Sequence, residues 1–164
     1  MRELGFDYNF RHYDKNGNLL YNSGWLPNQV SDDGFELIYD VFFRGATAPT
    51  GFSIGLAKVP ISQDDSLDDV TEITGTSYSR QTVERSAVGF PTLALDSGDM
   101  QIVSKEVVFE NTGETAWDGA TDAFLVADLA TDVLVCWRAL SSTRTLQPGD
   151  KLNVTMKIKG KQPA

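Results

Sequence analysis

The residue types that most often carry catalysis are scarce in this sequence. It contains a single histidine, His12, and a single cysteine, Cys136. A catalytic cysteine needs a base within hydrogen-bonding reach, so a Cys–His pair would require these two distant segments to meet. Cys136 lies in the apolar run 133–137, which favours a buried thiol that behaves as a small hydrophobic side chain. One histidine excludes a metal cluster built on several histidines, and one cysteine excludes an internal disulfide.

Carboxylate side chains could also bind a metal ion, and they concentrate between residues 64 and 72. Such a loop offers the oxygen ligands that Ca²⁺ takes, but the spacing of an EF-hand is absent. We therefore interpret 64–72 as a solvated acidic loop and leave calcium binding open. Residues 14–18 also begin like a calcium loop, yet Gly17 stands earlier than the glycine of such a loop. Carboxylate pairs for glycoside hydrolysis are set by the fold, and nothing in the sequence singles out one pair.

The sequence has neither a Walker A pattern nor a Gly-x-Gly-x-x-Gly pattern. We therefore expect no bound cofactor, no catalytic residues and no enzymatic activity.

The N-terminal segment has the pattern of a β-hairpin. Aromatic and polar side chains alternate from Phe6 to Asp14, which is the period of a half-buried strand. The dipeptide Asn16-Gly17 suits a type I′ turn, and 18–22 returns as the second strand. Because a two-stranded ribbon is barely stable alone, it must dock on the rest of the chain or on a neighbour.

One helix is predicted, over residues 32–44. Asp33 and Glu36 have the spacing of a capping box, and Gly45 is placed to end the helix. Its apolar residues recur at helical spacing, which predicts a face packed on the core. These residues are Phe35, Ile38, Val41 and Phe42.

Short β patterns separated by turn signals fill the rest of the chain. We expect strands at 51–59, 77–83, 101–109, 123–127, 133–139 and 152–158. This succession predicts a mainly β fold, an antiparallel β-sandwich or jelly-roll-like domain with one short helix and an N-terminal β-hairpin. We divide the chain into an arm at 1–25, docked on the domain or a neighbour, and a single β-sandwich domain at 26–164.

The charge and the apolar content of the chain argue against nucleic acid and membrane as partners. Fourteen Lys and Arg against 23 Asp and Glu give a net charge of −9, which argues against nucleic acid. No stretch approaches the roughly 18 apolar residues of a membrane span, and residues 1–7 lack the apolar core of a signal peptide. We therefore expect a soluble chain that is not exported by the ordinary route. The C-terminal lysines share one strand face, a pattern usual for an edge strand. They are Lys151, Lys157, Lys159 and Lys161.

Several short motifs occur in an order that resembles a known family. They are residues 14–18, 42–45, 52–56, 68–72, 78–80, 134–140 and 146–150. In this order they resemble small bacteriophage virion proteins that are described as tail-fibre-like or accessory structural proteins. The resemblance implies a β-sandwich-like subunit of a repeated viral assembly and carries over no catalytic residue.

The resemblance sets the functional expectation. We expect a non-catalytic virion structural protein, made in the host cytoplasm, that docks on a symmetric assembly, either as capsid decoration or as a tail or baseplate accessory. Its partners would be other capsid or tail subunits, and we expect a homo-oligomer. Interface anchors are usually aromatic or arginine. Near the N-terminus the candidates are Tyr8, Phe10, Tyr21 and Trp25.

A carbohydrate- or receptor-binding module of a phage tail is the alternative. Such a module would use exposed aromatic side chains on a β face to bind a glycan receptor. The three tryptophans are the candidates, and Trp117 in the turn-rich segment 114–119 is the one we expect to be exposed. The other two are Trp25 and Trp137.

Overall fold

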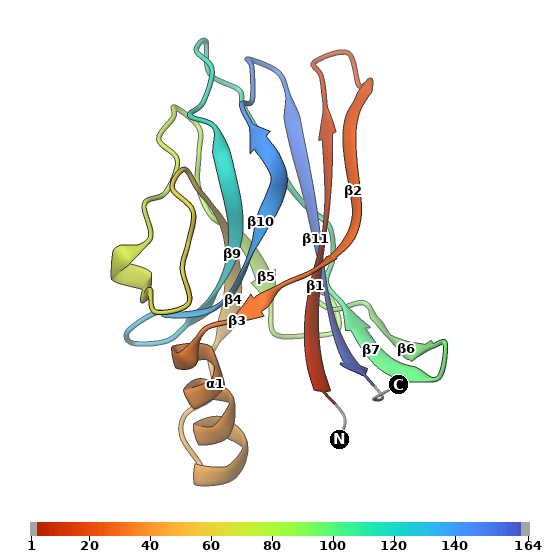
Figure 1. The fold of residues 1–164 in the computed structure, drawn as a ribbon, viewed down its shortest axis with the longest axis vertical. Coiled ribbons are helices and arrows are strands. Elements are labelled where there is room, and N and C mark those ends of the chain that lie inside the picture. The colour runs from red at the N-terminus through yellow and green to blue at the C-terminus, as the bar shows by residue number, and fades with distance from the viewer. Residues whose placement is uncertain (1–2, 162–164) are drawn as a thin grey trace.

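Two antiparallel β-sheets face each other in the computed structural model, which describes residues 3–161 (Figure 1). The first sheet runs in the order β2 (Leu19–Pro27), β1 (Glu3–Tyr13), β11 (Lys151–Lys161), β7 (Asp99–Val103) and β6 (Thr92–Asp96), and β8 (Val107–Glu110) also pairs with β11. The second sheet runs β3 (Gln29–Val30), β10 (Val133–Arg144), β9 (Ala120–Asp128), β4 (Gly51–Ala57) and β5 (Gln81–Glu84). The mainly β class and the sandwich predicted from the sequence are confirmed.

The core lies between the sheets because apolar side chains alternate along the long strands. On β1 the inward residues Phe6, Tyr8 and Phe10 are buried, and Leu152 and Met156 of β11 are buried beside them. Strand β9 is buried on both faces, because segment 58–80 covers the outer face of the second sheet (Figure 1). The chain thus has a main core between the sheets and a smaller one under that segment.

The N-terminal hairpin forms, but its turn differs from the one predicted. Gly17 has a φ of 81°, its N–H donates to the Asp14 carbonyl, and the Asp14 carboxylate accepts from the backbone N–H of Asn16 and Asn18. Only Gly17 of the dipeptide has a positive φ, so the type I′ prediction was wrong. The loop is a type I turn followed by a left-handed glycine. Strand β1 also pairs with β11 along its whole length.

Residues 32–44 are helical as predicted, but the helix is capped by a different residue and its last five residues are π-helical. Helix α1 (Asp32–Tyr39) begins after Ser31, whose hydroxyl accepts from the Gly34 N–H at 2.9 Å. The predicted cap at Asp33 was wrong by two positions. A π-helical segment, η1 (Asp40–Arg44), continues the helix, and Gly45 ends it with a φ of 75° as predicted.

The core face predicted for this helix is only partly confirmed. Ile38 packs on the core, but Phe35 is 38% exposed and Phe42 is 76% exposed. The physical reason is position: α1 and η1 extend beyond the end of the sandwich (Figure 1), so part of their apolar surface has no sheet beneath it.

Three strand predictions also need correction. The strand predicted at 77–83 begins only at Gln81, as β5, because Tyr78 and Arg80 are held in the polar contacts with Glu72 and not in a ladder. The predicted strand at 101–109 is interrupted, because Ser104 turns its hydroxyl toward the backbone of β11 and accepts from the Met156 N–H. Strand β11 is not an edge strand, since β1 flanks it on one side and β7 and β8 on the other. Its lysines face acidic neighbours across the sheet instead: Lys151 pairs with Glu110.

No helix among residues 3–161 has the length and apolar character that crossing a membrane requires. A short 3₁₀ helix, η2 (Leu67–Asp69), lies within the segment that covers the second sheet.

Candidate interaction surface

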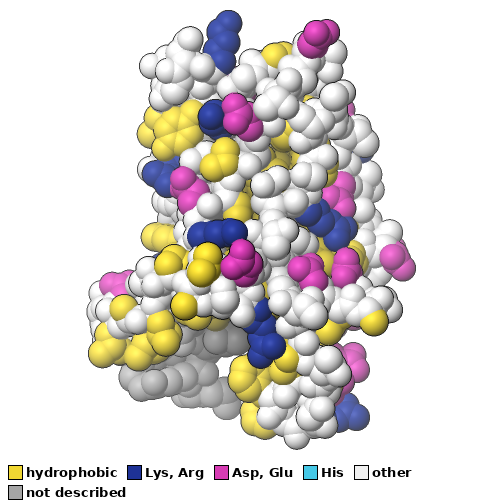
Figure 2. All heavy atoms as spheres, turned by 180° about the vertical axis from the view of Figure 1, so that it is seen from behind, with side chains coloured by type: hydrophobic (Ala, Val, Ile, Leu, Met, Phe, Trp, Pro, Cys, Tyr) yellow, Lys and Arg dark blue, Asp and Glu magenta, His cyan; other side chains and the backbone are white. Residues whose placement is uncertain are grey.

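An apolar cleft of about 770 Å³ opens at the end of the sandwich where α1 and the β6–β7 hairpin stand. Only two of its lining residues, Arg85 and Ser86, have polar side chains. The others are apolar and come from both sheets, from α1 and η1, and from the segments that connect them. Figure 2 shows hydrophobic side chains gathered at this end, on the α1 side and on the β6–β7 side. The cleft can therefore bind apolar groups but offers almost nothing to a polar ligand.

One wall of the cleft is the inner face of the β6–β7 hairpin. The register pairs Leu93 with Ile102 and Leu95 with Met100, so these four side chains share one face. Leu93 and Leu95 are each 69% exposed, because the hairpin projects past the opposite sheet (Figure 1). Exposed leucines in adjacent positions of one strand face are unusual for a surface that meets only water.

The other wall is formed by α1 and η1 through Leu37, Ile38, Val41 and Phe42, and an aromatic ridge lies beside this wall on the same helix. Phe35 stacks on Tyr39 with 6.2 Å between ring centres, and Tyr39 contacts Phe43 at 6.5 Å. Phe42 points into the cleft and is one of its lining residues. Phe42 and Phe43 are 76% and 80% exposed.

The size of this ridge can be compared with ordinary protein surfaces. Taking roughly 200 Å² for each ring, its four aromatic side chains leave about 500 Å² of apolar surface in contact with water. The largest apolar patch on a typical monomer is about 300–600 Å² and is often functional. The ridge, the cleft and the hairpin face are contiguous, and we call them together the open-end surface.

The four aromatic residues predicted as interface anchors lie elsewhere, and none of them lines the cleft. Tyr8 and Phe10 are fully buried in the core, with parallel rings 5.8 Å apart. Tyr21 is half-buried under the Arg144 guanidinium, 3.7 Å from the ring centre. Trp25 is 43% exposed on the outer face of the first sheet. Their role in an interface stays a prediction.

The two residues with catalytic potential are each engaged in the core by a different partner. His12 Nε2 lies 3.2 Å from Asp150 Oδ2, and both side chains are buried. Cys136 Sγ lies 3.6 Å from the Tyr8 hydroxyl. Burial raises the pKa of the Cys136 thiol to about 12, so it stays protonated at neutral pH. The structure does not bring these two residues together as a pair.

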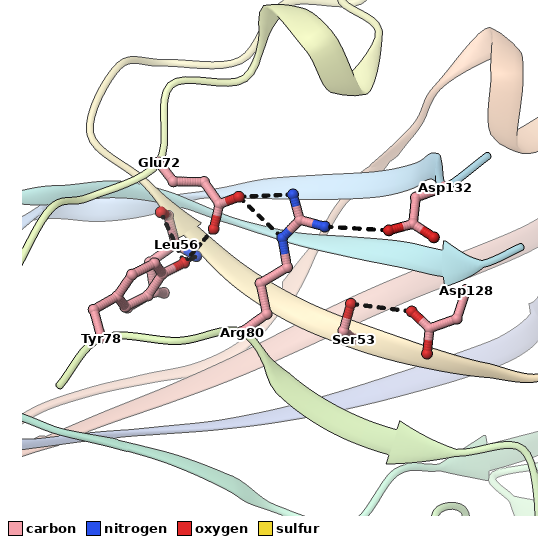
Figure 3. A network of polar contacts seen from close by, with 7 residues as sticks. All are labelled: Ser53, Leu56, Glu72, Tyr78, Arg80, Asp128 and Asp132. Atoms are coloured by element: carbon pink, nitrogen blue, oxygen red, sulfur yellow. Dashed lines mark hydrogen bonds and ion pairs between the residues drawn. The ribbon is translucent and has the colours of Figure 1, made fainter. Parts of the chain in front are cut away.

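Ser53 stands in the spacing Gly-x-Ser-x-Gly formed by residues 51–55, which marks the nucleophile in many hydrolases. That role needs a sharp turn between a strand and a helix, whereas here Ser53 lies in the middle of β4. Its hydroxyl is 3.3 Å from Asp128 Oδ1 (Figure 3). The one histidine of the chain is paired with Asp150 instead, so Ser53 lacks the base that would activate it.

The most connected polar cluster is centred on Glu72 and Arg80 (Figure 3). Arg80 donates two hydrogen bonds to Glu72 Oε1, at 2.9 and 2.7 Å, and lies 3.7 Å from Asp132. The Tyr78 hydroxyl donates to Glu72 and accepts from the Leu56 N–H. Burial is the main cause that raises the pKa of Tyr78 well above its ordinary value. The cluster fastens segment 58–80 to the second sheet, and we assign it a structural role.

The acidic loop at 64–72 uses its carboxylates in local hydrogen bonds. Asp65 accepts from the backbone and hydroxyl of Ser62, and Asp69 accepts from those of Ser66. The bonds from Ser66 hold the pKa of Asp69 below its ordinary value. Within the part of the chain that the structure describes, no group of three or more His, Cys, Asp or Glu side chains is placed to hold a metal ion.

The tryptophan expected to be exposed is buried. Trp117 is 3% exposed and donates from Nε1 to the Thr76 carbonyl, and Trp137 is equally buried. The prediction failed because the turn-rich segment around Trp117 folds back onto Tyr78, with the two rings edge to face at 5.6 Å. Trp25 is the exposed one of the three.

The open-end surface was not predicted from the sequence, although signals for it exist. Leu93, Leu95, Met100 and Ile102 alternate around Ser97-Gly98, which is a hairpin pattern. Phe42 and Phe43 are adjacent, and two adjacent helical residues cannot both face one core. The pattern gives the apolar faces, but only the fold shows that nothing in the described chain covers them.

Comparison with protein families gives one match. Residues 29–158, about four fifths of the chain, match the family model described as Podophage GP4 fiber I protein gp80. No curated protein gives a significant match. The matched range contains α1, η1, the β6–β7 hairpin and every residue that lines the cleft except Phe6. It begins after the four predicted anchors at the N-terminus.

Proposed function

The chain belongs to the Podophage GP4 fiber I protein gp80 family and is therefore a structural component of a phage virion, and we propose that it is a non-catalytic subunit that docks on a neighbouring virion subunit through its open-end surface. The observation that carries this proposal is the apolar cleft with its two exposed walls. Burying such a surface is the main favourable contribution in most protein association. The neighbour would present an apolar face of its own, because the cleft offers only Arg85 and Ser86 as polar partners.

A passive role also agrees with where the reactive groups lie. The thiol of Cys136 and the imidazole of His12 are buried in separate contacts, and Ser53 lies in a regular strand. Proteins that act by docking need a rigid scaffold and a complementary surface, and the sandwich supplies the scaffold. The family description favours a fibre as the place of attachment over capsid decoration.

Assembly of phage particles with altered protein tests the proposal. Replacing two exposed aromatics, as Phe42→Ser with Phe43→Ser, removes most of the ridge without touching the buried core. We expect the amount of this protein in purified virions to fall at least about tenfold, since loss of central apolar anchors costs an interface several kcal/mol. The measurement is a quantitative immunoblot of purified particles.

A matched control uses two leucines on the opposite end of the molecule. Leu19 and Leu20 in β2 are about half exposed, beside the β1–β2 turn that lies far from α1 (Figure 1). Leu19→Ser with Leu20→Ser removes a similar kind of side chain and should leave incorporation unchanged. Equal incorporation of the Phe42/Phe43 variant and of this control would show that the open-end surface is not the docking site.

Glycan binding is a second candidate, and Trp25 is the observation that favours it. Its ring is 43% exposed, and the Lys157 ammonium lies 4.3 Å from the ring centre on the buried side. Asn9 stands opposite Trp25 in the register, and Thr155 stands opposite Asn9, so polar side chains flank the ring on this face. Sugars commonly bind to such a ring with polar neighbours.

Tryptophan fluorescence tests this second candidate. Because Trp117 and Trp137 are buried, a glycan that stacks on the protein should change the emission of Trp25 alone, and Trp25→Phe should abolish the change. A panel of host surface glycans that leaves the emission of the wild-type protein unchanged would remove this candidate.

A further inference from the structure

Strand β6 ends the first sheet and leaves one edge without a partner among the described residues. Ser97 and Gly98, with φ of 54° and 89°, form the two-residue turn of the β6–β7 hairpin. In such a hairpin the residues that flank the turn are hydrogen-bonded to each other, and bonded and non-bonded pairs alternate from there. Ala94 therefore bonds to Gln101 within the hairpin. The backbone N–H and C=O groups of Leu93 and Leu95 point to the open edge.

This edge lacks the protection that edge strands usually carry. Proteins place lysine, proline or inward-pointing charges on exposed edges to prevent pairing with other chains. Pro91 precedes the strand and Asp96 ends it, but the stretch between them reads Thr-Leu-Ala-Leu. Leu93 and Leu95 therefore present outward backbone groups and apolar side chains at the same place.

We propose that a second copy of this chain covers the edge, with β6 paired antiparallel to β6 of that copy about a two-fold axis at Ala94. This inference rests on the proposed function and names the neighbouring subunit. Leu93 would face Leu95 of the second copy, and the outward groups of these residues would form four hydrogen bonds across the axis. A two-fold interface of this kind uses the same patch on both subunits.

The side chains fit this arrangement. Residues directly opposite each other in an antiparallel pair lie on the same face, so the leucines of both copies would form one apolar floor between the two clefts. Ala94 would face its own counterpart in a close, non-hydrogen-bonded pair, where a small side chain fits. Asp96 would face Thr92 of the second copy, so the pairing places no two carboxylates opposite each other.

The apolar area exposed on the open-end surface also favours a whole subunit as the partner. A standard interface buries about 800 Å² on each partner. The aromatic ridge leaves about 500 Å², and the exposed leucines of β6 with Met100 add to it. A short peptide could not cover both walls, whereas a second subunit can.

A cysteine placed on the proposed axis tests the geometry directly. Cα atoms of a non-hydrogen-bonded pair lie about 4.5 Å apart, within the range of disulfides. Ala94→Cys should therefore form a covalent dimer under mild oxidation. In the control variant Thr92→Cys, the two new cysteines would be about 13 Å apart, given the rise per residue of a strand. The native Cys136 is fully buried and does not compete.

Non-reducing electrophoresis at several protein concentrations gives the outcome. Cross-linking of Ala94→Cys but not of Thr92→Cys supports the two-fold pairing. Equal cross-linking of both variants, or of neither, overturns it.

Light scattering on a sizing column supplies a second measurement on the full chain. The wild type should be a dimer, and Leu95→Lys should weaken association at least about tenfold because it puts a charge at the paired edge. Leu20→Lys, on the edge strand β2, should remain a dimer. A wild-type monomer, or a dimer that Leu95→Lys leaves intact, would overturn the inference. If the wild type is monomeric while the Phe42/Phe43 variant still fails to enter virions, the proposed function stands and only this partner is wrong.

Discussion

Single charged residues differ widely in how much they stabilise the fold, because burial decides the strength of each ion pair. Lys157 and Asp7 pair at 3.4 Å with both side chains nearly excluded from water, and the Trp25 ring covers the ammonium group. Lys151 and Glu110, on the same sheet, pair at 3.3 Å but are close to half exposed. The distances are alike, so the surroundings must make the difference.

Replacing these two lysines should separate the effects. Lys157→Ala leaves the Asp7 carboxylate buried without this partner, and we expect it to lower the free energy of unfolding by about 3 kcal/mol. Lys151→Ala should cost less than about 1 kcal/mol, because exposed pairs contribute little. Urea denaturation of both variants measures the difference. Equal losses would mean that the buried pair is no stronger than the exposed one.

The buried thiol gives a prediction about pH. Burial raises the pKa of Cys136 from its ordinary value near 9 to about 12. The folded protein therefore keeps a proton that the unfolded chain releases above pH 9, so this group favours folding below pH 9 and loses that contribution as the pH rises toward 12. At pH 8 a maleimide should react with Cys136 only as fast as the protein unfolds. Rapid labelling under native conditions, as fast as in denaturant, would contradict the burial.

At the scale of elements, the sequence predicts what depends on neighbours along the chain. The alternation from Phe6 to Asp14 predicts the first hairpin, and the spacing of Phe35 and Ile38 predicts the helix. Contacts between distant segments are not visible in that pattern. Ser104 ends β7 because its hydroxyl bonds to β11, and β11 is central because three other strands pair with it.

The start of the helix is also decided by a contact with a distant segment, which the local sequence pattern does not show. The sequence favours Asp33 as the cap because Glu36 follows at the right spacing. The fold instead selects Ser31, whose hydroxyl caps Gly34 and also donates to the backbone carbonyl of Leu134 on β10. Gly34 is required here, since a Cβ at this position would lie 2.1 Å from the Val135 carbonyl oxygen. The cap is thus chosen by packing against β10.

Two alanine variants distinguish the caps. Ser31→Ala should lower the free energy of unfolding by about 1–2 kcal/mol, because it removes the cap and a bond to β10. Asp33→Ala should cost less than about 1 kcal/mol, because only its interaction with the helix dipole is lost. Thermal unfolding monitored by circular dichroism compares them. A larger loss for Asp33→Ala would restore the cap predicted from the sequence.

For the whole molecule, net charge and apolar surface act in opposite directions on assembly. The chain carries a net charge of −9, so two copies repel each other at long range. The open-end surface is almost free of charge, with Arg85 as the one charged residue that lines the cleft. Two charged pairs, Lys151 with Glu110 and Lys157 with Asp7, lie away from the cleft on the outer face of the first sheet.

Because the cleft is apolar and the net charge is carried elsewhere, the effect of salt on self-association can be predicted. Salt shortens the range of electrostatic repulsion, from about 14 Å at 50 mM to about 4 Å at 500 mM, and leaves apolar contacts in place. Self-association through the open-end surface should therefore strengthen as sodium chloride is raised between these concentrations. Sedimentation velocity at both salt concentrations measures the change in the dimer dissociation constant. An interface built on ion pairs would respond in the opposite way, so weaker association at high salt would place the contact on a charged face instead of the cleft.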